Sequence, residues 1–586
     1  MTATVHYRVS PLRRHEHLFA VEARFPDSPA SLRLWMPVWT PGSYLVREYA
    51  RHVQELRATD ADGTPLTVER LDKASWRVGN PAGGEVRVRY LVYANELTVR
   101  TNHLDADHGF FTGAALFLTS DAHRPLPCRL ELEVPEGWRA FCALRQGEGG
   151  LEAADFDELV DSPVEMGPHR VLEFQVAGVP HQVVLSGEGE VDGERLTCDL
   201  AAICQQAAAV FGGALPFERY LFIVHLTDKG RGGLEHRAST TLQHPRFGLR
   251  SGKAYEDFLA LAAHEYFHLW NVKRIAPAAF VPFDYLAEGY TRQLWAFEGI
   301  TSYYDTLLVR RAARIDARGF LRRLGETITT LESTPGRQAL SVAESSLLAW
   351  IKLYRADENT PNTAISYYTK GEVVAALLDL RIRAATGGQR SLDDAMRLLF
   401  GRHGQGAGVP EGGVEQACVE VGGASLAAFF ADAVHGTTEL DYSPLRSAGL
   451  TLRRRPRRGS ADKGGTAGDE SECAWLGVEL KAGERAVVAT TFAGTTASGH
   501  GLYAGDEIVA LDGFRVNGAS LTERVAGRRP GERVRLSLFR GDRLLELELP
   551  VAACPPNACW IEKLPQADAQ QKSLYQAWLG EPFDAP

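Results

Sequence analysis

Residues 261–275 constrain the fold more than any other stretch, because their sequence, LAAHEYFHLWNVKRI, predicts a helix with two histidines on one face. Residues 254–276 contain no Gly or Pro and are rich in Leu, Ala and Phe, so we expect a helix over 254–272. His264 and His268 are one turn apart on the same face, with Glu265 beside them. Zinc hydrolysis needs such groups: two nitrogen ligands, and a carboxylate that takes a proton from a metal-bound water.

The HExxH pattern alone does not establish a metal site. Its histidines are equally consistent with ordinary, partly buried helix residues, and a chain of this size and composition contains the pattern by chance in about one case in thirty. Zinc hydrolases keep three protein ligands and leave the fourth position to water. The hypothesis therefore depends on a third ligand.

Two downstream glutamates compete for that third place. Glu298 lies in TRQLWAFEGITSYYDTLLVRRAAR, residues 291–314, which predicts a helix with ample apolar cover. An unpaired carboxylate is costly to bury there, and a metal removes the penalty. Glu288 precedes Gly289 in a stretch that is more typical of a connection. Burial favours Glu298, and Glu288 stays open as the alternative.

Length and composition exclude several classes of protein. A chain of 586 residues is too long for one core and indicates about three or four domains. A net charge of -10 argues against nucleic acid or an anionic membrane as the main partner. The first 25 residues enter strand-like alternation directly, so we expect neither a signal peptide nor a membrane span. Eight scattered cysteines without a CxxC pair indicate reduced thiols and a cytoplasmic location, although Cys554 and Cys559 are close enough to pair.

The pattern along the chain predicts a multidomain protein. Residues 1–180 read as an all-β domain, with strands expected at 4–9, 18–25, 32–39, 85–93, 129–134 and 170–176. Residues 181–453 read as an α+β, mostly helical catalytic domain, with one strand at 220–226 and helices at 196–211, 254–272, 291–314, 317–333, 364–386, 391–402 and 424–435.

The end of the chain separates into three parts. Residues 454–472 are charged, rich in Gly and poor in apolar side chains, which predicts a flexible linker. Residues 473–552 return to short strands, expected at 475–480, 486–491, 507–511 and 534–539. The tail, 553–586, holds one amphipathic piece at 574–579, to which the sequence assigns no role.

At this point the sequence resembles a known family. HEYFHLWNVKRI, then PFDY, LWAFEGITSYYD and SYYTKGEVVAALLDLRIR, together with an early PGSY loop, are similar to the glycyl aminopeptidases, zinc peptidases of the gluzincin group with a C-terminal PDZ domain. The resemblance implies a thermolysin-like catalytic domain and one Zn²⁺ per chain, held by His264, His268 and Glu298. It also implies that 473–552 is a PDZ domain, in which WLGV and GLYAGDEIVALDG match.

Two further sites follow from the resemblance. Tyr368, in the YTKG match to a YxKG motif, is expected to donate its hydroxyl to the oxyanion of the tetrahedral intermediate. Core packing is the alternative for Tyr368 and its neighbour Tyr367. Gly232, Gly233 and Glu235, in GGLEH, resemble the exopeptidase GxMEN segment. The glycines let a backbone approach, and the Glu235 carboxylate would hold the substrate's free α-ammonium. A solvated loop charge is the alternative for Glu235, and the role of His236 is open.

The resulting hypothesis is an aminopeptidase that prefers small N-terminal residues, Gly and Ala, a preference that only the resemblance implies. Glu265 serves as the general base and passes the proton to the leaving amine. Its partners are peptides with a free N-terminus, together with a peptide C-terminus at the PDZ domain. The alternatives are a zinc endopeptidase of the same fold and a PDZ peptide-binding scaffold with an inactive metal site. The oligomeric state stays open, a homo-oligomer included.

Overall fold

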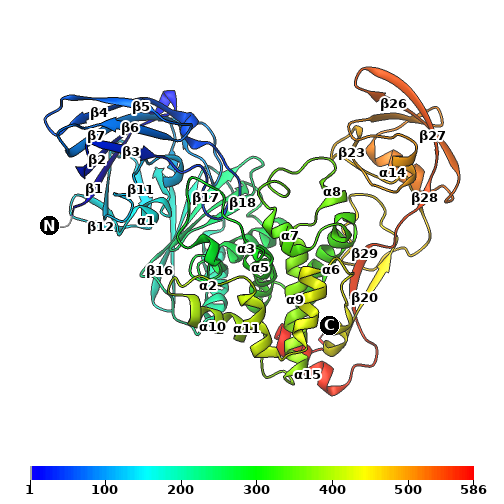
Figure 1. Cartoon of the computed structure of the whole chain (residues 1–586). Coiled ribbons are helices and arrows are strands. Elements are labelled where there is room, and N and C mark those ends of the chain that lie inside the picture. Colours follow the sequence, from blue (N-terminus) through cyan, green and yellow to red (C-terminus); the bar gives the residue numbers. More distant parts are fainter. Residues whose placement is uncertain (1–2, 586) are drawn as a thin grey trace. The chain divides into compact units, whose positions relative to one another are not determined.

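The computed structural model describes residues 3–585, which fall into two compact units. The first consists of the residues up to Gly289 together with Phe400–Val409, and the second of Tyr290–Leu399 and the residues from Pro410 onward (Figure 1). A β-rich N-terminal part and a helical part are present, as predicted. Among the described residues no helix combines the length and hydropathy that crossing a bilayer requires.

The N-terminal part of the first unit is built on a ten-stranded sheet in the order β12-β13-β10-β1-β2-β7-β4-β5-β6-β3. Alternation along β1 buries Val5, Tyr7 and Val9, and this period-two pattern is what predicted the strand. The strands are β1 (Val5–Arg13), β2 (Leu18–Ser28), β3 (Ser31–Trp35), β4 (Val53–Asp60), β5 (Pro65–Arg70), β6 (Ser75–Gly79), β7 (Gly84–Tyr93), β10 (Cys128–Leu132), β12 (Arg145–Gly147) and β13 (Gly150–Ala153). The expected strand at 32–39 is shorter, because it ends at Trp35 before the PGSY loop.

A smaller sheet in the same unit has the order β11-β14-β9-β8. Its strands are β8 (His103–Leu104), β9 (Gly109–Phe111), β11 (Arg139–Cys142) and β14 (Val164–Gly167). The short helix α1 (Phe156–Val160) precedes β14 and is capped by Asp155, whose side chain accepts from the Glu158 amide. Every residue of β14 is buried, including Glu165.

A five-stranded mixed sheet, β15-β16-β17-β19-β18, carries the next part of the unit. Its strands are β15 (Arg170–Val176), β16 (Val179–Ser186), β17 (Tyr220–Thr227), β18 (Gly232–Glu235) and β19 (Ser239–Pro245). The strand expected at 220–226 is present as β17, but the expectation that it is the only strand here is wrong, because β17 pairs in parallel with β16 and β19. Residues 170–176, grouped above with the N-terminal strands, form β15 of this sheet. The sheet packs against α2 (Gly193–Val210) and α3 (Gly252–Phe267).

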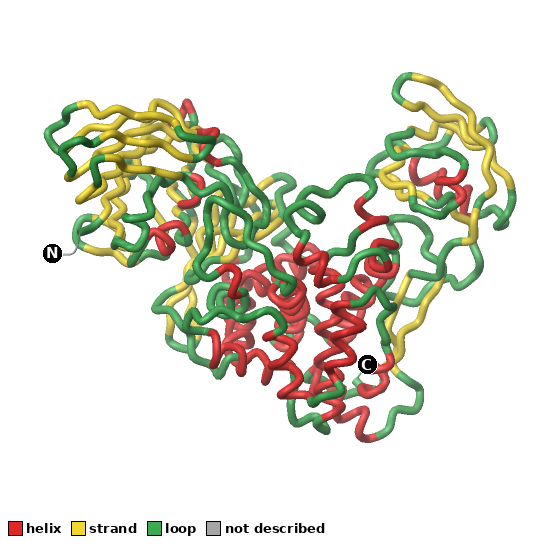
Figure 2. Tube along the Cα trace, in the orientation of Figure 1, coloured by secondary structure: helices red, strands yellow, loops and turns green. Residues whose placement is uncertain are grey.

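The second unit contains a helical core in which α5 (Gly299–Arg311), α6 (Ala317–Glu332) and α9 (Tyr367–Ala385) contact one another (Figures 1 and 2). Other helices of the chain's second half are α4 (Leu294–Phe297), α7 (Val342–Leu347), α8 (Thr360–Thr363), α10 (Leu392–His403), α11 (Gly413–Gly422) and α12 (Leu426–Phe430), followed by a π-helical turn at Ala431–His435. The tail forms α15 (Ala569–Leu579), which packs on α5 and α9. There the Trp578 indole donates to the Tyr303 hydroxyl at 2.8 Å, so the amphipathic piece seals the helical core.

Residues 473–552 form a separate β-rich module around a sheet in the order β22-β23-β24-β26-β27, with β25 beside β24. Its elements are β21 (Ala474–Trp475), β22 (Val478–Leu480), β23 (Ala486–Thr491), α13 (Thr496–Gly499), β24 (Glu507–Leu511), β25 (Phe514–Arg515), α14 (Gly518–Ala526), β26 (Arg533–Arg540), β27 (Arg543–Pro550) and β28 (Ala552–Ala553). They enclose a hydrophobic core of their own, with Val488, Leu536, Leu538 and Leu549 fully buried. The strands expected at 486–491, 507–511 and 534–539 are present, whereas the one expected at 475–480 is divided into β21 and β22, which pair with different strands.

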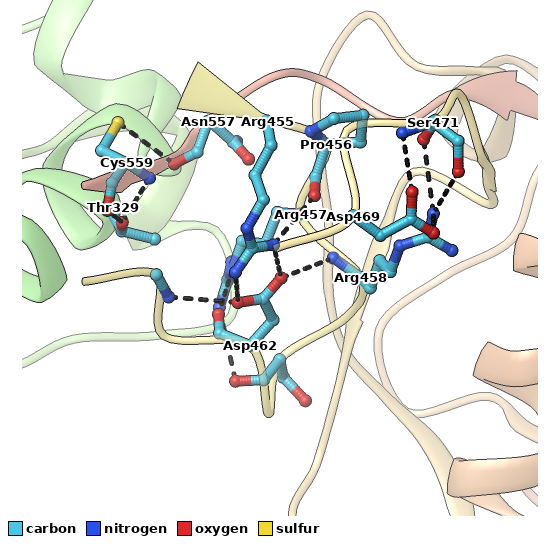
Figure 3. Close-up of polar contacts among 12 residues, drawn as sticks. Thr329, Arg455, Pro456, Arg457, Arg458, Asp462, Asp469, Ser471, Asn557 and Cys559 are labelled. Atoms are coloured by element: carbon cyan, nitrogen blue, oxygen red, sulfur yellow. Dashed lines mark hydrogen bonds and ion pairs between the residues drawn. The ribbon is translucent and has the colours of Figure 1, made fainter. Parts of the chain in front are cut away.

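The segment 454–472, expected to be a flexible linker, carries an ordered polar network (Figure 3). Arg455 ends β20 (Leu450–Arg455), which pairs with β29 (Ala558–Lys563), and its guanidinium binds Asp462 through two hydrogen bonds of 2.6 and 2.9 Å. Asp462 also accepts from the Arg458 and Gly464 amides. The Gly465 amide donates to the Cys559 carbonyl, and the Cys559 amide donates to the Thr329 hydroxyl of α6. Ion pairs and hydrogen bonds therefore hold this segment in place, although its sequence has no pattern of buried apolar residues.

Candidate active site

The two histidines of the HExxH motif converge at the C-terminal end of α3. The helix ends at Phe267, one turn earlier than predicted, so that His264 lies in its last turn and His268 is the C-cap residue. The Nε2 atoms of the two rings are 3.0 Å apart, with the ring planes at 85°. Nδ1 of His268 donates to the Asn271 carbonyl oxygen at 2.7 Å, which turns its Nε2 toward His264. The histidines are therefore not ordinary helix residues with separate environments.

Glu265 lies beside this pair and against strand β18. Its side chain is 5% exposed, and a Cβ added to Gly233 would overlap its carboxylate. Only glycine fits at position 233, because the strand passes directly over the carboxylate. Gly232 has a φ of +147°, which a side chain rarely adopts. Close approach to Glu265 thus requires glycine at 233, whereas backbone conformation favours glycine at 232.

Glu235 ends β18 and belongs to the same cluster. One carboxylate oxygen of Glu235, one of Glu265 and one ring nitrogen of His268 lie within 4.8 Å of one another. Glu235 is 3% exposed, and its Oε1 has no hydrogen-bond partner among the described residues, so the solvated-loop alternative is wrong. A buried carboxylate oxygen without a donor is a ready acceptor for a cationic group. Strand β18 is also the edge of its sheet.

The PGSY loop forms one wall of this cluster. A Cβ at Gly42 would overlap the Glu235 carboxylate, so the loop backbone lies directly against it. The loop is held by the Trp39 indole, which donates to the carbonyls of Asp284 and Ala287 at 2.7 and 3.0 Å. Tyr44 stacks on Phe280 and is 1% exposed. Tyr44 is therefore a structural residue, and Gly42 is the loop residue that approaches the site.

His236 takes part in a buried polar link. Its Nδ1 lies 3.2 Å from Asp161 Oδ1, and the Arg237 amide donates to Asp161 Oδ2. Lys273 Nζ, on the turn after the HExxH helix, binds the same carboxylate at 2.6 Å. Burial would raise the pKa of Asp161, but Lys273 and His236 hold that pKa below its usual value. The ionised Asp161 thus ties the segment after Glu235 to the segment after His268.

Glu298 lies in the second unit, at the junction of α4 and α5, where it serves as C-cap of one helix and N-cap of the next. The predicted single helix over 291–314 is therefore wrong: it starts at Leu294 and is interrupted at Glu298. Glu298 is 2% exposed among Trp295, Phe297 and Ile300, whereas Glu288 is exposed. The burial argument that separated the two glutamates is confirmed.

Tyr368 lies in the first turn of α9, capped by Ser366. Tyr367 is fully buried, whereas Tyr368 is half-buried and stacks on it with ring centroids 4.7 Å apart. Helices α5 and α9 cross at two glycines: a Cβ at Gly371 would lie 2.6 Å from the Trp295 carbonyl oxygen and 2.7 Å from Gly299 Cα. Because α5 and α9 are held together at this crossing, the position of Tyr368 on α9 is fixed relative to Glu298 at the α4–α5 junction.

The predicted site residues are distributed over both units. His264, His268, Glu265, Glu235, Gly232 and Gly233 lie together in the first unit, and Glu298 and Tyr368 lie in the second. Sequence reasoning missed Gly42, Asp161 and Lys273. The Pro-Gly dipeptide of the loop indicated a turn. No motif or hydrophobic pattern in the sequence assigns a role to Asp161 or Lys273.

Comparisons with known proteins find relatives of this chain. The peptidase M61 N-terminal domain model matches residues 6–168, and the M61 glycyl aminopeptidase model matches residues 257–374. A crystal structure of an aminopeptidase N family protein from Idiomarina loihiensis is 32% identical, with a TM-score of 0.93 over 98% of this chain and 100% of that one. An M1 zinc metallopeptidase from Deinococcus radiodurans is 14% identical over 75% of this chain and 94% of its own, with a TM-score of 0.45, too low to bear on function. A search of the curated proteins gives no significant match.

These matches define the chain as a peptidase. The fold of both units is shared with the Idiomarina structure along nearly the whole length. The chain belongs to the M61 glycyl aminopeptidase family.

Proposed function

We propose that this peptidase is a zinc-dependent aminopeptidase that removes a small N-terminal residue, Gly or Ala, from peptides. The observation that carries the proposal is the buried cluster of Glu235, Glu265 and His268, with His264 beside it. It combines converging imidazoles, a carboxylate placed for proton transfer, and a second carboxylate oxygen without a partner. An endopeptidase needs the imidazoles and the carboxylate for proton transfer, but it does not need a second carboxylate that binds a free α-ammonium.

The donor set fits a zinc ion. His264 and His268 offer two ring nitrogens 3.0 Å apart, one of them oriented through Asn271. Glu298 is proposed as the third ligand, supported by its burial among apolar side chains, where a nearby cation offsets the cost of its charge. A bound zinc ion supplies a Lewis acid that polarises the scissile carbonyl and makes water acidic at neutral pH.

The chain's own residues have the following proposed roles. Glu235 accepts hydrogen bonds from the substrate's α-ammonium, which sets cleavage one residue from the N-terminus. The free edge of β18 pairs with the extended substrate backbone. Glu265 takes a proton from the attacking water at its carboxylate and delivers it to the leaving amine. The Tyr368 hydroxyl donates to the carbonyl oxygen as that oxygen gains charge.

Blocked and free substrates test the proposal. The aminopeptidase should hydrolyse glycyl and alanyl anilides and ignore the acetylated compounds, because an acetyl group removes the cation that Glu235 holds. Glu265→Gln should lower kcat by about a factor of 100 or more while leaving the bound-metal content unchanged. Equal cleavage of acetylated substrates would favour the endopeptidase, and full activity of Glu265→Gln would refute the assigned base.

A pair of tyrosine variants tests the oxyanion donor. Tyr368→Phe removes a hydroxyl that is proposed to act only in the transition state, so kcat should fall by about 100-fold or more with little change in KM. Tyr367→Phe is the matched control, since it removes the neighbouring hydroxyl from the core at the same helix turn. Steady-state kinetics of both variants decide the assignment: comparable losses in kcat would mean that Tyr368 acts only through packing.

Residues 473–552 are proposed to be a PDZ-type module. Support comes from the groove between β22 and α14, lined by Val478, Leu480, Leu521 and Val525. Its inner cavity holds about 40 Å³. Arg458, Gly459 and Ser460 of the preceding segment line it as well, so a peptide would have to displace them.

A further inference from the structure

A second cluster of metal-binding side chains lies in the first unit, outside the candidate active site. It is centred on Glu165 of β14, which is fully buried. Three imidazoles surround this carboxylate: His108 Nδ1 at 2.9 Å, His169 Nε2 at 2.7 Å and His225 Nε2 at 2.8 Å. We call these four residues the Glu165 cluster. One atom each from His108, Glu165 and His225 lies within 4.8 Å of the others.

The four residues come from separate parts of the fold. His108 immediately precedes β9, His169 follows β14, and His225 lies on β17 beside Ser186 of β16. The cluster therefore joins the four-stranded sheet to the five-stranded sheet that carries β18. No part of the proposed peptidase mechanism uses any of its members.

The cluster buries polar groups at a cost. Glu165 is fully buried, and His225 is 1% exposed. His108 and His169 both approach Oε1 of Glu165, and His225 approaches Oε2. A cation bound among these groups would offset the cost of burying them together.

We propose that the Glu165 cluster is a second metal site, which binds a structural Zn²⁺ through His108, His225 and Glu165. These are the three members whose donor atoms lie within 4.8 Å of one another, and all three are buried. Two imidazole nitrogens and one carboxylate oxygen form a donor set typical of zinc. His169 donates to the same carboxylate and orients it.

The decisive protein is the double variant His264→Ala/His268→Ala, which removes the proposed catalytic ligands and leaves the Glu165 cluster intact. After dialysis against zinc and removal of the excess, elemental analysis should find about two zinc ions per wild-type chain and about one in this double variant. Adding Glu165→Gln to the double variant should remove the remaining ion. His123→Gln in wild type is the matched control, because it removes another buried histidine and should leave the content unchanged.

Spectroscopy of the double variant checks the site without a further substitution, in case Glu165→Gln does not fold. Cobalt in place of zinc should give the intense visible bands of a four-coordinate site with two imidazole ligands. One zinc in wild type and none in the double variant would refute the second site and leave the proposed function intact. One zinc in both proteins, lost with Glu165→Gln, would support the Glu165 cluster and refute the catalytic metal centre instead.

Discussion

At the scale of single residues, helical spacing predicted which side chains of the HExxH motif lie together. The residues that surround them depend on contacts between distant parts of the chain. His264, Glu265 and His268 are neighbours in sequence, so a helical period was enough to place them together. Gly42 and Glu235 are separated by nearly two hundred residues, and no pattern at either position indicates the other. Such contacts follow from packing between loops, which local propensity does not encode.

Gly42→Ala should disrupt substrate binding, because its Cβ would overlap the Glu235 carboxylate. We expect kcat/KM for free N-terminal substrates to fall by about tenfold or more, since a displacement of the ammonium acceptor misplaces the scissile bond. Gly63→Ala is the matched control: Gly63 has the same φ of +86° but nothing within 4 Å of an added Cβ. It should lower stability by about 1 kcal/mol through backbone strain and leave kinetics unchanged. Equal kinetics for the two variants would contradict this account of Gly42.

At the scale of elements, the break at Glu298 is the feature that apolar periodicity did not predict. The pattern over 291–314 is helical on both sides of the break, and the residue after the break, Gly299, lies against Gly371 of α9. Helices α5 and α9 come together backbone to backbone at this point. The glycines in WAFEG and YTKG therefore have a packing role that a motif comparison does not state.

Gly371→Ala should destabilise the helical core by about 1–3 kcal/mol, because the new methyl meets backbone atoms of Trp295 and Gly299 that cannot rotate away. The variant should also lose activity, since the crossing positions Tyr368. Gly401→Ala, on α10, is the control: nothing lies within 4 Å of its added Cβ, so better helix propensity should raise stability by about 0.5–1 kcal/mol. Urea unfolding measures both, and a stable, active Gly371→Ala would show that the crossing tolerates a side chain.

At the scale of the whole molecule, composition indicated three or four domains, and the structure divides into two compact units. The segment 454–472 lacks apolar residues and reads as flexible, yet Arg455 and Asp462 fold it through paired charges. The tail showed only a short amphipathic piece, yet it forms a helix in the core of the second unit. Hydrophobic patterning detects segments that bury apolar faces, and it cannot detect order that rests on ion pairs or on distant partners.

Asp161 links three parts of the first unit, so replacing it should lower the stability of that unit. Asp161→Asn should cost about 3 kcal/mol at pH 7, since Lys273 is left buried without its counter-charge. The pKa of Asp161 is lower in the folded state, so its contribution is present above about pH 4 and is lost as pH falls below that. The stability gap between wild type and variant should therefore shrink in acid.

Unfolding by urea at pH 7 and pH 3 measures that gap. Asp157→Asn is the control. Asp157 lies on the short helix α1, whose C-cap residue is Asp161, and it pairs with Arg124. The Asp157 side chain is 36% exposed, against 14% for that of Asp161. Its loss should cost about 1 kcal/mol or less. A gap for Asp161→Asn that is the same at both pH values would show that the carboxylate is not ionised in the folded protein.

The contact between Trp578 and Tyr303 has a consequence for biosynthesis. The two residues are 275 positions apart, and the indole fills a place beside helices that leave the ribosome much earlier. Translation adds about 5–20 residues per second, so these helices wait roughly 15–55 seconds for their last partner. While the intervening β-rich module is made, the nascent second unit therefore exposes the apolar surface that Trp578 later covers. The yield of folded protein should depend on chaperones that shield such surfaces.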